Sequence, residues 1–368
     1  MAKKSSDWLT WHLKNSTLIT EIFQNELTIP DFDCTQLNNY EQIGSYSWSS
    51  YSRPYNPIIV IPGRPSVLIQ NLQSLVSQHL IFNSEQSIID ENRFYLHNHP
   101  MEPILRTVPI CSPKFEFSKI DFLTDRNNLR KLLDFVENKT DRSFIIDFQK
   151  VGNFILMVRN EERNLGRDNS FGKDFENVAS LVNQGYCGHR RIVTYSFGDL
   201  NFVTRFEVDC VEDDDLEFKE DDYFRNKLKF SDKSKLSYII DGKFRPRVLV
   251  ELTSRSKTDF PVKKWAQMFF SKTDYLVIGR HRDGILNRIQ KLSFEQVTHI
   301  LQNRKNIQPT MGRLNSLMHK IKELVKDENC VYSLVYDYSN KSMKFCKLDN
   351  HQPYLPNDLI EQFSNKNI

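Results

Sequence analysis

The sequence of 368 residues has no apolar run near the roughly 20 residues that a membrane-spanning helix requires. Its first residues, Met1 to Asp7, include two lysines and two serines, and no apolar signal core follows them. We therefore expect an intracellular protein that works in the nucleus, the cytoplasm or both, without a membrane partner.

Cysteine pairs at metal-binding spacing are also missing. The six cysteines are Cys34, Cys111, Cys187, Cys210, Cys330 and Cys346. Because no two of them have C-x-x-C spacing, the sequence argues against a zinc site. Their scatter is typical of reduced thiols in a reducing compartment.

The chain has little excess charge of either sign. Lys and Arg number 50 against 47 Asp and Glu, which gives a net charge of +3. Nucleic-acid binding therefore requires a local basic groove, because the bulk charge does not predict it. The mean hydropathy of −0.52 and the 12% aromatic content are those of a soluble chain with enough apolar mass for a core.

Turn residues between β-rich runs predict four hairpins. The expected strand pairs are 143–149 with 153–158, 190–195 with 201–210, 275–279 with 285–289, and 331–338 with 343–348. Their turns fall at Val151-Gly152-Asn153, at Gly198-Asp199, at Asp283-Gly284 and around Asn340.

Helical periodicity is expected in six places, 8–27, 121–136, 172–182, 265–271, 294–303 and 311–327. In the second of these, Thr124 or Asp125 is the expected N-cap, and one apolar face contains Leu129, Leu132, Leu133 and Val136. Four prolines predict an irregular path over 44–68, and the charged run 211–245 predicts a solvated excursion between strands.

These patterns predict an α/β fold with mixed central β-sheets flanked by helices. No internal repeat or low-complexity linker divides the chain, so we expect one domain over 1–368. Its parts would be an irregular and helical N-terminal part (1–120), a core (121–292), and C-terminal helices with a hairpin (293–368).

Three carboxylates fall on two predicted strands, 204–210 and 248–253. Glu207 and Asp209 are two residues apart, so they point to the same face of a strand. Glu251 interrupts an apolar run, and burying one carboxylate costs several kcal/mol unless a cation pairs with it. Hard oxygen ligands suit Mg²⁺ or Mn²⁺, and Glu176 on the preceding helix adds a fourth acid.

Other patterns have simpler explanations. A Glu-x-Asp pair is common on salt-bridged surface strands. The pair His97 and His99 fits a polar loop better than a metal site, and the acidic run 213–215 fits a solvated loop better than a diphosphate site. Glycines beside Cys187 and His189 fit a turn. The basic residues of 311–327 slightly favour a solvated face over a nucleic-acid groove.

The acids stand in a recognisable order. Arg126 is followed by Gly172-Lys173-Asp174-Phe175-Glu176, then by Glu207-Val208-Asp209, then by Glu251-Leu252-Thr253. This order resembles the DXO family of RNA decapping nucleases and 5′–3′ exoribonucleases, a branch of the PD-(D/E)XK nuclease superfamily. The family pattern is an arginine, Gly-x-x-x-Glu, Glu-x-Asp and Glu-x-Lys.

The similarity extends to flanking segments. It continues through Trp265-Ala266-Gln267-Met268-Phe269-Phe270, where the family has a Trp-x-Gln helix, and through Leu276-Val277-Ile278-Gly279. The segments 46–106 and 124–133 are similar to a fungal-type branch. The resemblance covers 120–292 best, and it implies a PD-(D/E)XK nuclease-like core there.

The resemblance implies roles for individual residues. Glu176, Glu207, Asp209 and Glu251 would be catalytic and would ligate Mg²⁺ or Mn²⁺, with the carbonyl of Leu252 beside them. Arg126 would contact the RNA 5′ end, since its forked guanidinium suits phosphate. Gln267 would contact the scissile phosphate or its water.

One position departs from the pattern, because Thr253 stands where the family has a lysine. Threonine donates a hydrogen bond but brings no charge, and losing one electrostatic stabiliser costs on the order of 10²–10³ in rate. Arg255 faces the same way if the strand continues, and we place it in the substrate site. Lys257, Lys263 and Lys264 are candidates for a migrated cation.

Two functions follow from these observations. The first is a metal-dependent nuclease that acts on RNA 5′ ends in RNA quality control, by decapping incomplete or non-standard caps, by 5′–3′ exonucleolysis, or both. The second is a nuclease-like protein that lost turnover and binds RNA 5′ ends or a partner 5′–3′ exoribonuclease. A structural scaffold without RNA affinity is a third and weaker alternative.

Overall fold

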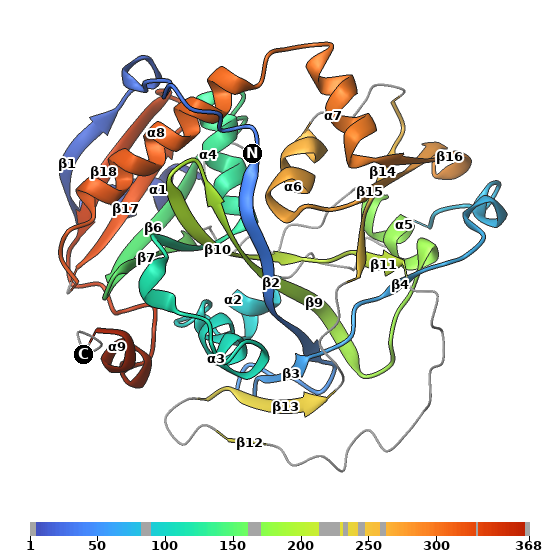
Figure 1. Cartoon of the computed structure of the whole chain (residues 1–368), viewed down its shortest axis with the longest axis horizontal. Helices are drawn as coiled ribbons and strands as arrows, with labels where there is room; N and C mark the ends of the chain where they lie inside the picture. Colours follow the sequence, from blue (N-terminus) through green and yellow to red (C-terminus); the bar gives the residue numbers. More distant parts are fainter. Residues whose placement is uncertain are drawn as a thin grey trace.

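The computed structural model describes residues 5–81, 90–160, 171–212, 229–230, 235–241, 247–257, 263–328 and 330–364. Two mixed β-sheets form its centre, and helices cover them, as Figure 1 shows. The α/β fold class predicted from the sequence is therefore confirmed. Among the described residues, no helix has both the length and the apolar character that crossing a membrane demands.

The larger sheet has twelve strands, and its two edges are β1 and β12. In spatial order the strands are β1 (Ser16–Ile22), β18 (Ser342–Leu348), β17 (Val331–Asp337), β6 (Phe144–Val151), β7 (Phe154–Asn160), β5 (Phe122–Asp125), β10 (Leu200–Glu207), β9 (Tyr186–Phe197), β2 (Leu37–Ser49), β3 (Ile58–Pro62), β13 (Ser237–Asp241) and β12 (Lys229–Phe230).

The smaller sheet has six strands. Their spatial order is β16 (Ile285–Ser293), β15 (Tyr275–Arg282), β14 (Val248–Arg255), β11 (Cys210–Glu212), β4 (Val67–Leu68) and β8 (Ser180–Leu181). In Figure 1 these strands lie to the right of the long strands β2 and β9.

The α-helices are α1 (Ser5–Lys14), α2 (Glu91–Tyr95), α3 (Glu102–Cys111), α4 (Arg126–Val136), α5 (Gly172–Ala179), α6 (Lys263–Ser271), α7 (Phe294–Gln302), α8 (Gln308–Leu324) and α9 (Asn357–Ser364). Short 3-10 turns occur at Gln24–Glu26, Leu72–Leu75 and Phe117–Lys119. The predicted loop with His97 and His99 connects α2 to α3.

All four predicted hairpins are present, as β6–β7, β9–β10, β15–β16 and β17–β18. In the third, Arg282 pairs with Ile285, and the two turn residues, Asp283 and Gly284, have φ angles of 50° and 86°. Positive φ at both central positions matches the right-handed twist of the strands, and Asp-Gly tolerates it. The Asp-Gly sequence therefore predicted the position of this hairpin turn correctly.

The helix predicted over 8–27 is wrong in its second half. After α1, residues Ser16–Ile22 form β1, an edge strand that pairs antiparallel with β18 through Ser16 and Leu348. The β-branched residues of this segment suit a strand, but the partner lies more than 300 residues away in the chain. The helix predicted over 172–182 is also too long, because α5 ends at Ala179 and β8 follows.

The segment 44–68 is not irregular, as its prolines suggested, but contains the end of β2 and the whole of β3 and β4. Pro54 and Pro57 lie between strands, Pro62 is the last residue of β3, and Pro65 lies before β4. The prolines thus delimit the strands instead of interrupting them. Of the charged excursion predicted over 211–245, the parts 213–228, 231–234 and 242–245 lie outside the described residues, while β12 and β13 extend the larger sheet.

The segment predicted as a helix from 121 begins with a strand. Residues Phe122–Asp125 form β5, which lies parallel between β7 and β10, and the helix α4 starts at Arg126 with Asp125 as its N-cap. The side chain of Asp125 does not cap the helix, because it accepts hydrogen bonds from Arg205 instead. Arg126 is consequently the first residue of a helix that leaves the end of a buried strand.

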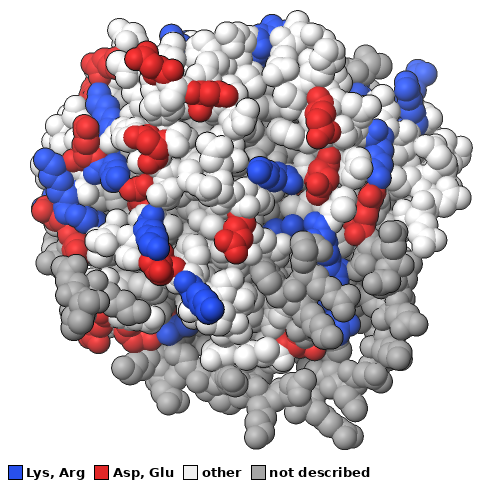
Figure 2. Space-filling model, in the orientation of Figure 1, with Lys and Arg blue, Asp and Glu red and all other residues white. Residues whose placement is uncertain are grey.

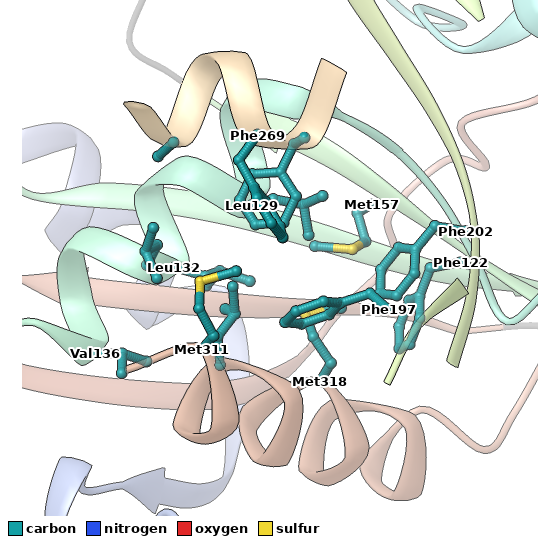
Figure 3. Close-up of a cluster of buried hydrophobic side chains, with 14 of the residues drawn as sticks. Phe122, Leu129, Leu132, Val136, Met157, Phe197, Phe202, Phe269, Met311 and Met318 are labelled. Carbon is teal, nitrogen blue, oxygen red and sulfur yellow. The ribbon is translucent and has the colours of Figure 1, made fainter. Parts of the chain in front are cut away.

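Three helices pack on one face of the larger sheet around a shared apolar cluster. Figure 3 shows Leu129, Leu132 and Val136 of α4 meeting Phe269 of α6 and side chains of α8. The predicted apolar face of α4 is buried, which confirms that part of the sequence analysis. Each such side chain contributes about 1.5–3 kcal/mol when fully buried. This packing fixes α4 and α6, and with them the residues that face β14.

Candidate functional site

The connection from β10 to β11 carries the chain from the larger sheet to the smaller one. β10 ends at Glu207, and β11 begins at Cys210, which pairs with Val250 of β14. The prediction of one strand through 204–210 is therefore wrong, and Val208 and Asp209 link the two sheets. Glu207 is the last residue of β10 in the larger sheet, and Asp209 directly precedes β11 of the smaller one.

Glu251 is the most deeply buried of the predicted acids, at 4% exposed. Its Oε1 accepts a hydrogen bond from Nζ of Lys264 at 2.5 Å, and its Oε2 accepts one from Nη1 of Arg126 at 3.3 Å. Burial opposes ionisation, but Lys264 and Arg126 together hold the pKa of Glu251 below its usual value. The buried carboxylate is thus charged and paired, as the sequence argument required.

Arg126 occupies the first position of α4 and is itself buried. Besides Glu251, its Nη1 reaches the hydroxyl of Ser271 at 3.2 Å, and its guanidinium lies 5.3 Å from the centre of the Phe206 ring. A planar cation stacked on an aromatic face keeps a fixed orientation. Arg126 therefore orients the carboxylate of Glu251 from the side of α4.

Asp209 has a different environment from Glu251. Its Oδ2 accepts the backbone N–H of Leu252 at 2.8 Å. Burial raises the pKa of Asp209 well above its usual value, and the negative charges of Glu251 and Glu176 raise it further. A carboxyl group whose pKa is raised by burial and by neighbouring acids is typical of functional sites.

Glu176 reaches the same region from α5. Its carboxylate is half-buried and forms an ion pair with Lys173 at 2.9 Å, one helical turn earlier. Burial raises the pKa of Glu176, Lys173 opposes this, and Glu207 adds to it. Neighbouring Phe175 packs over Gly279 of β15, where an added Cβ would lie 2.6 Å from the ring. That glycine lets α5 lie close to the sheet.

Glu207 is the most exposed of the four acids, with a side chain 46% accessible. It pairs with Nη1 of Arg190 at 3.2 Å, and Nη2 of the same arginine donates to Glu91 of α2 at 2.5 Å. Arg190 and Glu91 were missed in the sequence analysis. Counting back from the Gly198-Asp199 turn places Arg190 directly opposite Glu207, so the hairpin register contained the signal for the first of them.

The candidate cations differ in their partners. Lys264, in the first turn of α6, contacts Oε1 of Glu251 and lies 3.5 Å from the carbonyl oxygen of Leu252. Lys263 points to Asp141 instead, at 3.2 Å. Lys257 lies beyond the end of β14 and is exposed.

Three further predicted positions lie on the same two elements. Thr253 and Arg255 are half-buried on β14, which does continue to Arg255. Gln267 is half-buried on α6, one turn after Lys264, and its backbone carbonyl accepts from Ser271. The predicted substrate-binding residues therefore lie on elements that also carry Glu251 or its partners.

Three of the predicted acids lie on neighbouring elements, since α5, which carries Glu176, packs against β14, which carries Glu251. Asp209 accepts the backbone N–H of Leu252, the residue after Glu251, and the charges of Glu251 and Glu176 raise its pKa. Glu176, Glu207 and Glu251 are each paired with a basic side chain. Within the described residues, no group of three acids, histidines or cysteines is spaced to hold a metal ion. The donors are all hard oxygens, and the excess of negative charge at Asp209 is of the sign that a divalent cation neutralises. The donor atoms thus suit Mg²⁺ or Mn²⁺ in chemistry, but among the described residues their spacing is not that of a metal site, and Lys264 contacts Glu251 in place of an ion.

A family model described as "Domain of unknown function (DUF8563)" matches residues 17–360. The chain belongs to this family. No curated protein matches its sequence.

Solved structures similar to this DUF8563 member are Rai1 and Dxo1 proteins. Rai1 of Scheffersomyces stipitis in complex with (3′-NADP)⁺ and calcium is 14% identical, with a TM-score of 0.67, and the match covers 94% of this chain and 99% of that one. Rai1 of Candida albicans in complex with pU5 and Mn²⁺ is 15% identical, with a TM-score of 0.63 and coverages of 94% and 96%. Dxo1 of K. lactis in complex with manganese is 10% identical, with a TM-score of 0.60 and coverages of 92% and 99%.

The resemblance to the DXO family is therefore confirmed at the level of the fold, over most of both chains. At identities of 10–15% this likeness shows the architecture and does not assign roles to residues.

Proposed function

We propose that this protein is a divalent-metal-dependent nuclease that acts on RNA 5′ ends in RNA quality control. It would remove incomplete or non-standard caps, release nucleotides from the 5′ end, or do both. The observation that carries the proposal is the hydrogen bond from the backbone N–H of Leu252 to Asp209, which holds this acid beside Glu251, with Glu176 on the adjoining helix α5. Support comes from the similar fold of Rai1 from Candida albicans, solved with pU5 and Mn²⁺.

The residues divide into two groups by role. The carboxylates of Glu176, Glu207, Asp209 and Glu251 and the carbonyl of Leu252 would hold the Mg²⁺ or Mn²⁺ ion. When bound, this ion would polarise a phosphoryl oxygen and lower the pKa of a coordinated water.

The chain's own side chains would bind and orient the RNA. Arg126 keeps Glu251 charged and in place, through the contact of its Nη1 with Oε2. Gln267 lies on α6, one turn after Lys264, and we assign it to the scissile phosphate or its water. We assign Arg255, at the end of β14, to the substrate and Arg126 to the neighbourhood of the RNA 5′ end, because a guanidinium recognises phosphate with two parallel hydrogen bonds.

The direct test is to incubate a 5′-phosphorylated RNA, labelled at its 5′ end, with the protein and Mn²⁺. We expect release of a 5′ fragment that a chelator prevents and that Glu251→Ala abolishes. Glu212→Ala is the matched control, because Glu212 lies on β11 of the same sheet and pairs with Lys291 at the surface. RNA that stays intact after prolonged incubation with Mn²⁺ rejects the nuclease function.

A second function is favoured by one observation, the uncharged Thr253 on the strand that carries Glu251. This second function is that of a nuclease-like protein that does not cleave RNA. It would bind either RNA 5′ ends or a partner 5′–3′ exoribonuclease, and it would use the basic residues of the site for binding. It would bind 5′-phosphorylated RNA in an anisotropy titration without cleaving it. Absence of RNA affinity at low salt would reject both functions.

We further propose that the protein works inside the cell, in the nucleus, the cytoplasm or both. The six cysteines support this, since all of them are free thiols and Cys34, Cys210 and Cys346 are buried. Burial raises the pKa of Cys34 to about 11, so this thiol stays protonated and unreactive. Imaging of a tagged protein in its native cell is the corresponding measurement.

A further inference from the structure

Lys264 holds an ammonium group between two oxygen atoms of β14. Its Nζ lies 2.5 Å from Oε1 of Glu251 and 3.5 Å from the carbonyl oxygen of Leu252. These two oxygens come from consecutive residues, and the next residue, Thr253, brings no charge. An ammonium from α6 thus supplies a positive charge beside a strand that has none at that position.

We infer that Lys264 is a built-in cation that competes with a divalent metal ion for Glu251 and Leu252. The inference rests on the proposed function, because it concerns the ion that the nuclease would use. Mg²⁺ binds oxygen ligands at about 2.0–2.1 Å. An ion that close to Oε1 of Glu251 and to the Leu252 carbonyl would overlap with the ammonium, so the two cations exclude each other there.

The position of Lys264 allows the exchange. Its side chain is 21% accessible, while that of Glu251 is 4% accessible, so the lysine can turn outwards while the carboxylate stays in place. Glu251 keeps its second partner, Arg126, when the ammonium leaves. A lysine has a flexible four-carbon stem and a compact charge, which suits such a movement.

After displacement by the metal ion, the ammonium of Lys264 would contact a phosphate of the RNA. Lys264 and Gln267 are three residues apart on α6, so both project from the same side of the helix. A phosphate next to Gln267 therefore lies within reach of the lysine. In this arrangement Lys264 lowers the affinity for the metal and contributes positive charge to the phosphate, which Thr253 cannot do.

Lys264→Met separates these two effects, because methionine keeps an unbranched apolar side chain and removes the charge. We expect the affinity for Mn²⁺, measured by calorimetry on the protein without RNA, to rise about tenfold, since the ion no longer displaces a charged hydrogen bond. At saturating Mn²⁺ we expect RNA cleavage to slow by about 10²-fold, as for the loss of one electrostatic donor.

Two further variants make the comparison decisive. Lys263→Met is the matched control, because Lys263 is the preceding residue of α6 and its Nζ faces Asp141, away from Glu251. It should change neither Mn²⁺ affinity nor cleavage. Lys264→Arg keeps the charge and should bind Mn²⁺ about as weakly as the wild type. Thermal unfolding of each variant without metal verifies that it is folded.

Equal or weaker Mn²⁺ binding by folded Lys264→Met would overturn the competition, and an unchanged rate at saturating Mn²⁺ would overturn the phosphate role. Failure of the nuclease proposal gives a different result. In that case wild-type protein leaves RNA intact, while the calorimetric comparison of Lys264→Met with Lys263→Met still decides whether the ammonium competes with the ion.

Discussion

At the scale of single residues, the candidate site is a set of acids with unequal partners. Glu251 has two cations, Arg126 and Lys264, and its pKa is lowered. Asp209 accepts a backbone N–H, and its pKa is raised by burial and by the neighbouring acids. The two neighbouring carboxylates thus have opposite pKa shifts: Glu251 keeps its charge more readily than a free carboxylate, and Asp209 takes up a proton more readily.

Thr253→Lys distinguishes the two proposed functions. If Lys264 of α6 already provides the positive charge, adding a lysine at position 253 of β14 should change the rate of RNA cleavage less than about threefold. If the wild type is a binding protein without turnover, the same substitution should create cleavage at a rate on the order of 10²-fold above background. Thr253→Met, which fills similar space without charge, is the control in both assays.

The two results of this experiment exclude each other. Cleavage by the wild type as fast as by Thr253→Lys contradicts the binding function. Cleavage that appears only in Thr253→Lys contradicts the nuclease function.

How far the site could be predicted depended on how local its contacts are. Lys173 and Glu176 are three residues apart on one helix, and Arg190 faces Glu207 across a hairpin, so both pairs follow from spacing. The pairing of Lys264 with Glu251 could only be offered as one of several candidates. It depends on how α6 packs on the sheets, which periodicity does not specify.

At the scale of elements, the contact between α5 and β15 positions Glu176. A Cβ at Gly279 would lie within 2.6–2.9 Å of three ring atoms of Phe175, and that ring is fully buried. Neither group can move without shifting α5 from the sheet. The carboxylate of Glu176, next to Phe175, would move with the helix.

Gly279→Ala should therefore lower the free energy of unfolding by about 1–3 kcal/mol, as overpacking of a core does. Urea denaturation measures this change, and RNA cleavage should fall with it. Adding Phe175→Leu shortens the side chain that clashes, so the double variant should be more stable than the sum of the two single changes. Strict additivity, or a Gly279→Ala protein as stable as the wild type, would contradict this account of the contact.

His189 on β9 makes the stability of the larger sheet depend on pH. It is buried, its Nδ1 bonds the hydroxyl of Ser47 at 2.9 Å, and burial lowers its pKa well below the usual 6.5. The positive charges of Arg191, Arg190 and Arg247 lower it further. The folded state consequently holds this imidazole neutral, whereas the unfolded chain protonates it below pH 6.5.

Because the unfolded state binds the extra proton, the wild type should lose stability as the pH falls below 6.5, by up to about 1.4 kcal/mol per pH unit from this group. His189→Gln can keep the bond to Ser47 and should lack this contribution. Urea denaturation between pH 5 and pH 8 should show the two stability curves diverging on the acid side. His319→Gln, at a partly exposed histidine, is the control. Parallel curves for wild type and His189→Gln would contradict the assignment.

The predictability of the elements follows the same rule as that of the site. Hairpins such as β15–β16 were predicted because the turn and both strands lie within about twenty residues. β1 was mistaken for a helix because its partner β18 is at the other end of the chain. One strand was predicted over 204–210, whereas the structure has two, β10 and β11, joined by Val208 and Asp209. The break could not be predicted locally, because it depends on the pairing of β11 with the distant strand β14.

At the scale of the whole molecule, the charges nearly balance, so the proposed binding of RNA would depend on a local basic site. The net charge is only +3. Figure 2 shows acidic and basic side chains interspersed over the described part of one face, without a broad area of one sign. On the described part of this face, the mixed charges create no broad positive field that would guide a polyanion along the surface. If the protein binds RNA as proposed, the basic groups around the acids are the expected contacts for a terminal phosphate.

This distribution predicts a shallow dependence of RNA binding on salt. Each phosphate neutralised on single-stranded nucleic acid adds about −0.7 to the slope of log K against log salt concentration. Two to four contacts at a 5′ end, from Arg126, Lys264 and Arg255, therefore give a slope of about −1.4 to −2.8. Anisotropy titrations of a 5′-phosphorylated RNA from 50 to 300 mM salt would measure it, with Glu251→Gln protein and no metal to prevent cleavage.

The same RNA with a 5′-hydroxyl should bind more weakly, with a slope closer to zero by about one unit, because its terminal phosphate is missing. A slope steeper than about −5 that ignores the 5′ phosphate would mean that RNA lies along an extended basic groove, and the site at the junction of the two sheets would then not be its anchor.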